Sequence, residues 1–106
     1  MSKQAFPAGQ PATLSAHDAL RIVRVLAARS ENVAVIAHAR MRKHQRRISH
    51  ADILRVLQKG VCVEGPYIAA KSGLWRLNVE GRSAGELLTC VVEIVWRKKL
   101  LVVTAF

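Results

Sequence analysis

The chain has 106 residues, 51% of them hydrophobic, and a mean hydropathy of +0.15. This length suits one domain rather than two, and the apolar content excludes an intrinsically disordered chain, because it suffices for a core. The 17 Lys and Arg residues exceed the 7 Asp and Glu residues, and the resulting net charge of +10 predicts nucleic acid or an acidic protein as partner.

The N-terminal residues 1–13 contain two of the three prolines and predict a flexible leader, followed by a single domain over residues 14–106. The leader lacks the apolar stretch of a signal peptide, and no window approaches the roughly 20 apolar residues of a membrane span. Both cysteines, Cys62 and Cys90, occur in apolar runs without CxxC spacing, which predicts buried free thiols. We therefore expect a cytoplasmic protein with no membrane partner.

The first half of the domain predicts three helices and one strand. A helix is expected over residues 15–29, where Ser15 caps the first turn and apolar side chains recur at helical spacing. The β-branched run at 33–36 predicts a short buried strand. Two more helices are expected over 38–47 and 49–59. Ser49 caps the second with Asp52 three residues on, and Gly60 ends it.

The second half predicts an antiparallel sheet. Its β-branched runs alternate with turns at hairpin spacing, and they place strands at 61–64, 74–80, 87–96 and 100–106. In the run 74–80, alternation places Trp75, Leu77 and Val79 on one face and Arg76 on the other. The expected fold class is therefore α+β, with a curved antiparallel sheet of four to five strands packed against two or three helices.

The segment 37–47 is strongly basic, with five Lys or Arg, two His and no acid. On a helix, one face would pack inward and two would be basic. One basic face carries His38, Arg42 and Arg46, and the other carries Arg40, Lys43 and Arg47. Such faces favour contacts with phosphate groups. The alternative is a solvated helix surface.

Several catalytic classes are excluded by the absence of their motifs: the chain has no GxxxxGK[ST], GxGxxG or HExxH pattern. His38 and His44 would lie about 240° apart around a helix, with no acid or cysteine nearby to complete a ligand set. No metal and no cofactor is therefore expected. Aromatic residues are also few, so base stacking is not the expected mode of nucleic-acid binding.

Several short motifs in combination resemble those of a known group of proteins. They are His38-Ala39 at a helix start, Arg46 eight residues later, Ile48-Ser49, Gly73-Leu74-Trp75-Arg76, and the terminal run Val102-Val103-Thr104-Ala105-Phe106. Over roughly residues 33 to 106, they resemble a family of small bacterial domains of unknown function in the RelE, BrnT and MqsR toxin superfamily. The usual pattern has Met five residues after the His, where this chain has Lys43 with Met41 nearby. The helix before the first strand is similar to the layout of MqsR-type toxins.

This resemblance implies a RelE-like fold and the toxin of a toxin-antitoxin pair. The implied activity is that of a metal-independent endoribonuclease, an mRNA interferase in which the RNA 2′-hydroxyl attacks the adjacent phosphate. The implied partners are RNA, either free or ribosome-bound mRNA, and a cognate antitoxin that is acidic or of the zinc-finger and helix-turn-helix type.

Such a reaction suits the residue types present, because a histidine can move a proton near neutral pH and arginine can stabilise charge in the transition state. The expected catalytic residues are His38, Arg46 and Arg76, and the expected RNA-binding residues are Arg40, Arg42, Lys43, Arg47 and Lys71. Two alternatives remain: a non-catalytic nucleic-acid-binding or protein-binding module of the same fold, and a basic domain with no nucleic-acid role.

Overall fold

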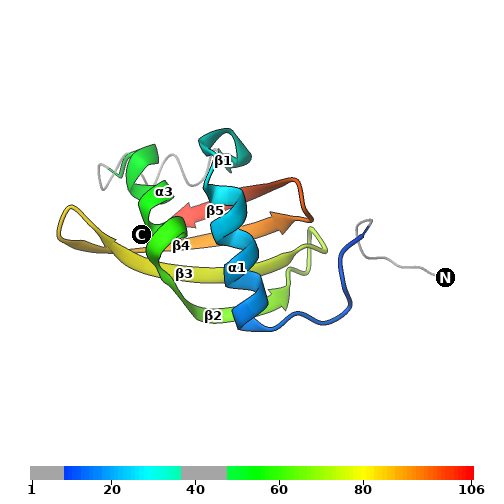
Figure 1. Ribbon diagram of the computed structural model, residues 1–106. Helices are drawn as coiled ribbons and strands as arrows, with labels where there is room; N and C mark the ends of the chain where they lie inside the picture. The colour runs from blue at the N-terminus through cyan, green and yellow to red at the C-terminus, as the bar shows by residue number, and fades with distance from the viewer. Residues whose placement is uncertain (1–8, 37–47) are drawn as a thin grey trace.

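The computed structural model describes residues 9–36 and 48–106, which form an α+β domain around a five-stranded sheet. Two α-helices, α1 (Ala16–Ala27) and α3 (His50–Lys59), lie side by side on one face of the sheet (Figure 1). The predicted α+β class is confirmed. The helix expected over 38–47 lies outside the described residues.

The strand order across the sheet is β1-β5-β4-β3-β2. The strands are β1 (Val33–Val35), β2 (Val61–Ile68), β3 (Trp75–Ser83), β4 (Glu86–Val95) and β5 (Lys99–Ala105). Neighbours from β2 to β5 are antiparallel, but β1 pairs in parallel with β5, so the sheet is mixed and the expectation of a purely antiparallel sheet is wrong at this edge. Hydrophobic periodicity identifies a strand but does not encode the direction of its partner.

Both predicted helix caps are present. The Ser15 side chain accepts a hydrogen bond from the Asp18 amide at 3.0 Å. Ser49 and Asp52 form a reciprocal capping box, in which each side chain accepts from the backbone amide of the other residue, at 3.0 and 2.8 Å. These bonds satisfy amides that the first helical turn leaves without partners.

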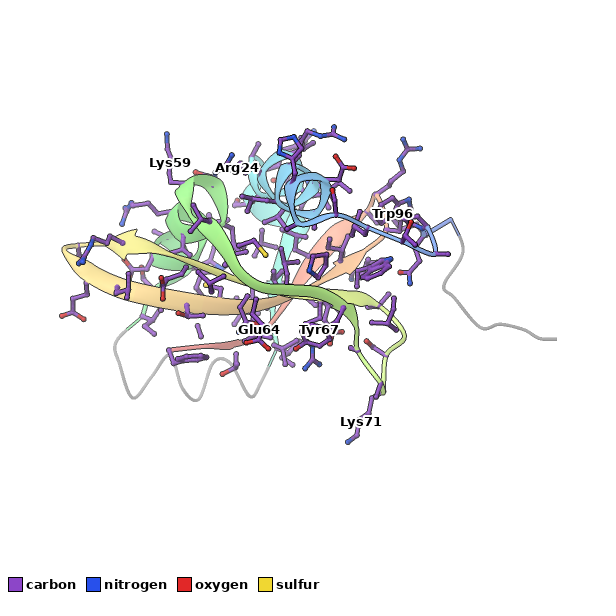
Figure 2. The ribbon with its side chains drawn as sticks, turned by 90° about the horizontal axis from the view of Figure 1, so that it is seen from below. Arg24, Lys59, Glu64, Tyr67, Lys71 and Trp96 are labelled. Carbon is purple, nitrogen blue, oxygen red and sulfur yellow. The ribbon has the colours of Figure 1, made fainter. Side chains whose placement is uncertain are left out.

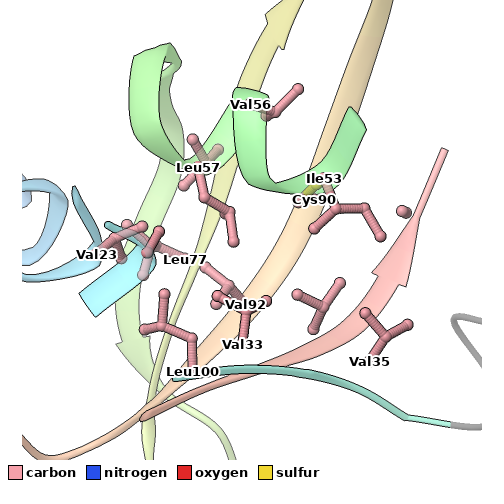
Figure 3. Packing of buried hydrophobic residues seen from close by; sticks show 14 of the residues in the cluster. Val23, Val33, Val35, Ile53, Val56, Leu57, Leu77, Cys90, Val92 and Leu100 are labelled. Atoms are coloured by element: carbon pink, nitrogen blue, oxygen red, sulfur yellow. The ribbon is translucent and has the colours of Figure 1, made fainter. Parts of the chain in front are cut away.

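The core lies between the two helices and the sheet (Figure 3). Val23 of α1 and Ile53 and Leu57 of α3 are fully buried against the sheet. The strands contribute inward-facing side chains in alternation, among them Leu77, Val79, Cys90, Val92, Ile94, Leu100 and Val102. Each large aliphatic side chain buried here contributes about 1.5–3 kcal/mol. The predicted inward face of β3 is therefore confirmed.

Gly60 follows α3, as the sequence predicts, but not in a left-handed conformation, since its φ is −77°. A Cβ atom there would lie 2.5 Å from the Glu80 carbonyl oxygen and 2.6 Å from that of Val56. Gly60 is therefore required because the end of α3 passes directly over the backbone of β3.

Residues 9–13 form no helix or strand, yet part of this segment is attached to the sheet. The Gln10 side-chain amide donates to the Gly73 carbonyl at 2.8 Å, and the Trp75 indole donates to the Pro11 carbonyl at 2.9 Å. The packed domain thus begins earlier than Leu14. Among the described residues, no helix has the length and apolarity needed to cross a bilayer.

Candidate functional site

The face of the sheet opposite α1 and α3 carries a row of polar side chains, and we call it the open face. Figure 2 shows Glu64 and Tyr67 on this side, with Arg24 of α1 and Lys59 of α3 on the other. Strand alternation and register place the following residues on it: Glu64, Tyr67, Arg76, Asn78, Glu80, Arg82, Thr89, Glu93 and Thr104. Polar groups from four neighbouring strands therefore share one surface.

An ion pair between Arg76 and Glu93 lies on the open face, near the end of the sheet where β3 begins and β4 ends. The two residues are directly opposite each other on β3 and β4. The Arg76 Nε donates to Glu93 Oε2 at 2.8 Å, and Nη2 donates to the same oxygen. The Glu93 side chain is 6% exposed and that of Arg76 is 29% exposed.

This pairing fixes the orientation of the guanidinium group. The hydrogen bond with Glu93 is the main cause that raises the pKa of Arg76 above its ordinary value, while burial acts in the opposite direction. Glu93 uses two of the five guanidinium N–H donors, and Tyr67 is a further hydrogen-bonding neighbour of the group. Arg76 thus presents a permanently charged hydrogen-bond donor whose orientation is fixed by Glu93, and its side chain is partly accessible.

Tyr67 extends the site along β2. It lies opposite Arg76 in the register, and its hydroxyl also contributes to raising the pKa of Arg76. The strand predicted over 61–64 ends before Gly65-Pro66, but β2 continues through both residues with irregular register on either side of Glu64. Gly65 has a φ of +92°, and a Cβ atom there would lie 2.9 Å from the Arg76 carbonyl oxygen. Glycine therefore allows the irregular strand to return to Arg76 at Tyr67.

Two polar atoms in the neighbouring row have no partner among the described residues. They are Oδ1 of Asn78 and Oγ1 of Thr104, and both are buried. Asn78 and Thr104 are each paired with Val91, from the two sides of β4, so they lie in one row across the sheet. Buried polar atoms without partners are uncommon and require an explanation. Both atoms lie in the row next to Arg76, so the polar character of the open face continues beyond the ion pair.

The charge on the open face is mixed. Besides Glu93 it carries Glu64 and Glu80, which accept long hydrogen bonds of 3.5 Å from Asn78 and Thr89. The excess positive charge of the chain is therefore not spread evenly over this face. Among the described residues, this face is therefore not a broad cationic surface.

The eight residues predicted from the sequence divide into two groups. Arg76 and Lys71 are described, and Arg76 faces away from the core as predicted. Lys71 is exposed in the loop between β2 and β3, where it extends on the side of the open face (Figure 2). The other six lie outside the described residues: His38, Arg40, Arg42, Lys43, Arg46 and Arg47.

Glu93 is not among the site residues predicted from the sequence, although two signals point to it. It is the only acid in the interior of the apolar run 87–96. In addition, the two-residue turn at Ala84 and Gly85, both with positive φ, pairs Ser83 with Glu86. Counting back from that pair places Arg76 opposite Glu93.

Within residues 9–36 and 48–106, no three His, Cys, Asp or Glu side chains are grouped as metal ligands. Cys62 and Cys90 are both free thiols, but the prediction that both are buried is wrong for Cys62, which is only partly buried. Burial raises the pKa of Cys90 to about 12.

Comparison with known proteins gives one match. A family model for a domain of unknown function, DUF4258, matches residues 35–106, which include α3 and strands β2 to β5 but not α1. No curated protein and no solved structure matches the chain. Because the family match spans well over half of the sequence, the chain belongs to the DUF4258 family of domains of unknown function.

Proposed function

We propose that this protein binds RNA on the open face of its sheet and cleaves it there, as the toxin of a cytoplasmic toxin-antitoxin pair. The observation that carries the proposal is the Arg76 guanidinium, held by the buried Glu93 carboxylate on a sheet face that α1 and α3 leave uncovered. The net charge of +10 supports a polyanionic substrate.

The proposed reaction is attack of the RNA 2′-hydroxyl on the adjacent phosphorus, with departure of the 5′-oxygen and formation of a cyclic phosphate. Negative charge develops on the phosphoryl oxygens in the transition state, and a preorganised donor at that position lowers the barrier. Arg76 would bind these oxygens through the N–H groups that Glu93 leaves free. Glu93 would act as a positioning residue, because its contact is with Arg76.

Proton transfer and further positive charge come, in this proposal, from the basic segment 37–47. A histidine such as His38 can exchange a proton near pH 7, which the reaction requires at the 2′-hydroxyl and at the leaving oxygen. Arg46 would add to the stabilisation of charge. Arg40, Arg42, Lys43, Arg47 and Lys71 would contact phosphates along the strand.

The alternative is a non-catalytic module that uses the same face to bind nucleic acid or protein. Such a module needs Arg76 as a hydrogen-bond donor to phosphate, but it needs no proton transfer. The two functions therefore differ in their dependence on His38 and on the 2′-hydroxyl of the substrate.

The test is incubation of the purified protein with an end-labelled single-stranded RNA, and with the DNA of the same sequence, in buffer containing EDTA. The proposal predicts cleavage of the RNA alone, products ending in a cyclic phosphate, and a loss of about 100-fold or more in rate for Arg76→Ala. Arg76→Lys serves as a second variant, because it keeps the charge but not the planar fork. Arg82→Ala is the matched control, since Arg82 is exposed on the same strand and about 20 Å away.

The outcomes separate the alternatives. RNA that is bound in a salt-dependent manner but remains intact would favour the binding module. Absence of both cleavage and salt-dependent binding would overturn any nucleic-acid role. A parental cleavage rate for Arg76→Ala would remove Arg76, and with it the ion pair with Glu93, from the site.

A further inference from the structure

A groove lies on the helix-covered side of the molecule, away from the open face. It has a volume of about 530 Å³ and is formed by α1, the segment before it and the turn between β4 and β5. Its apolar lining comes mainly from Leu14, Ile22, Val25 and Trp96, and Arg21 and Arg97 also line it. The family match begins at residue 35, so the α1 wall of the groove lies outside the matched region.

From this groove we infer a docking site for an acidic amphipathic segment of another protein. The proposal does not depend on RNA cleavage, because its residues and the open face lie on opposite sides of the sheet.

Much of the apolar lining also packs against the core, since Leu14, Ile22 and Trp96 are partly buried against it, but Val25 is exposed. Helix α1 packs inward through Ala19, Val23 and Ala27, which are fully buried. Val25 belongs to a different side of the helix and is 66% exposed. Polar residues ordinarily occupy that side of an amphipathic helix. An exposed valine beside a half-buried tryptophan is therefore apolar surface available to a partner.

The charges around the groove define the partner. Arg97 is exposed and is followed in the turn by Lys98 and Lys99. Of the described residues that line the groove, Asp18 alone is acidic, and it pairs with Arg21 at 3.6 Å. A segment with glutamate or aspartate beside a bulky apolar side chain would complement both the lining and its cations.

A nucleic acid fits this surface less well. Tryptophan and arginine around an apolar depression are typical of the most energetically important positions of protein interfaces. A backbone-binding surface for RNA instead presents a continuous series of cations and, for single strands, exposed rings for stacking. Trp96 is the one aromatic side chain among the described residues that line the groove.

The chain contains its own reporter for the test. Its two tryptophans are Trp75, which is buried and 7% exposed, and Trp96 in the groove. The probe is a fluorescein-labelled helical peptide of about 16 residues, long enough to follow α1, with leucines on one face flanked by glutamates. A second peptide has lysine in place of each glutamate, and a third has the first composition with its leucines dispersed.

We expect the acidic peptide to bind saturably in the micromolar range, to change the emission of Trp96, and to bind about tenfold or more tightly than the other two peptides. Val25→Asp should weaken this binding about tenfold or more, and the exposed position of Val25 should leave the fold intact. Val25→Ser repeats the test without adding charge.

The charge control compares Arg97→Glu with Lys59→Glu, which changes the net charge equally but lies on α3 outside the groove. Only Arg97→Glu should weaken binding strongly. Equal losses in these two variants, binding that is indifferent to both Val25 variants, or no saturation up to about 1 mM would overturn the proposal. Competition by an RNA oligonucleotide at this groove would overturn it in favour of a nucleic-acid site.

Discussion

The two faces of the sheet are built from the same strands but have different physical roles. On β3, Leu77 faces α3 and the core, whereas its neighbour Arg76 faces the open side and pairs with Glu93. The covered face is closed by aliphatic packing, and the open face keeps charged and polar groups that the fold does not need for its core. This contrast teaches that neighbouring residues of one strand can have different roles, one in stabilising the core and the other in a functional site. Substitutions on the two faces can test this difference.

The largest effect on stability is expected on the covered face, from Leu77→Ala. Leu77 is fully buried, and its truncation removes apolar contacts and leaves a cavity. We expect the free energy of unfolding to fall by about 3 kcal/mol, measured by urea denaturation. A loss below about 1 kcal/mol would show that this layer is loosely packed.

A smaller loss is expected on the open face from Arg76→Ala, about 2 kcal/mol, because the Glu93 carboxylate would remain buried without its partner. The double variant Arg76→Ala with Glu93→Ala should lose less than the sum of the two single variants, which urea denaturation can measure.

Arg82→Ala provides the control for an exposed arginine on the same strand, with a change of no more than about 0.5 kcal/mol. If Arg76→Ala were as mild as this control, the ion pair with Glu93 would contribute nothing to the free energy of unfolding.

The contact between Asp52, at the start of α3, and Ser83, at the end of β3, should respond to acid. Hydrogen bonds from Ser83 and then from the Ser49 backbone lower the pKa of Asp52 below its ordinary value. The folded state therefore gains stability from the ionised carboxylate above the pKa of the unfolded chain, and it loses this stability as the pH falls through the lower, folded pKa.

Asp52→Asn should cost about 1 kcal/mol near neutral pH, as loss of a helix cap does. The difference from the parent should shrink below about pH 4, in urea titrations at a series of pH values. A difference that stays constant down to pH 2 would show that the charge of Asp52 is irrelevant.

The smallest effect on stability is expected for Lys71→Ala, within about 0.5 kcal/mol, because Lys71 is exposed in a loop. If it contacts RNA phosphate, the slope of log affinity against log salt should decrease by about one, measured by filter binding. An unchanged slope would exclude Lys71 from the RNA-binding surface.

Much of the fold could be predicted because it depends on local patterns. The two caps at Ser15 and Ser49 arise from side chains within three residues of the amides that they bind. The inward face of β3 follows from alternation alone. The parallel pairing of β1 with β5 could not be predicted, because Val33 and Leu100 are far apart in the sequence.

The candidate site was predicted less completely. Strand alternation correctly predicted that Arg76 faces away from the core. Its partner Glu93 lies opposite it because of the register between β3 and β4. Tyr67 reaches the site only because β2 continues past Gly65 with irregular register. Neither position carries a motif in the sequence.

By itself, the sequence determined the charge, the element types, the caps and the side of β3 on which Arg76 lies, because these depend on composition and on contacts between residues near one another in the chain. Only the tertiary structure decided the mixed sheet, the burial of Glu93 against Arg76 and the groove between α1 and Trp96. These features depend on the direction, register and packing of segments that are distant in the sequence, and such long-range contacts are established only when the whole chain is closed into one core.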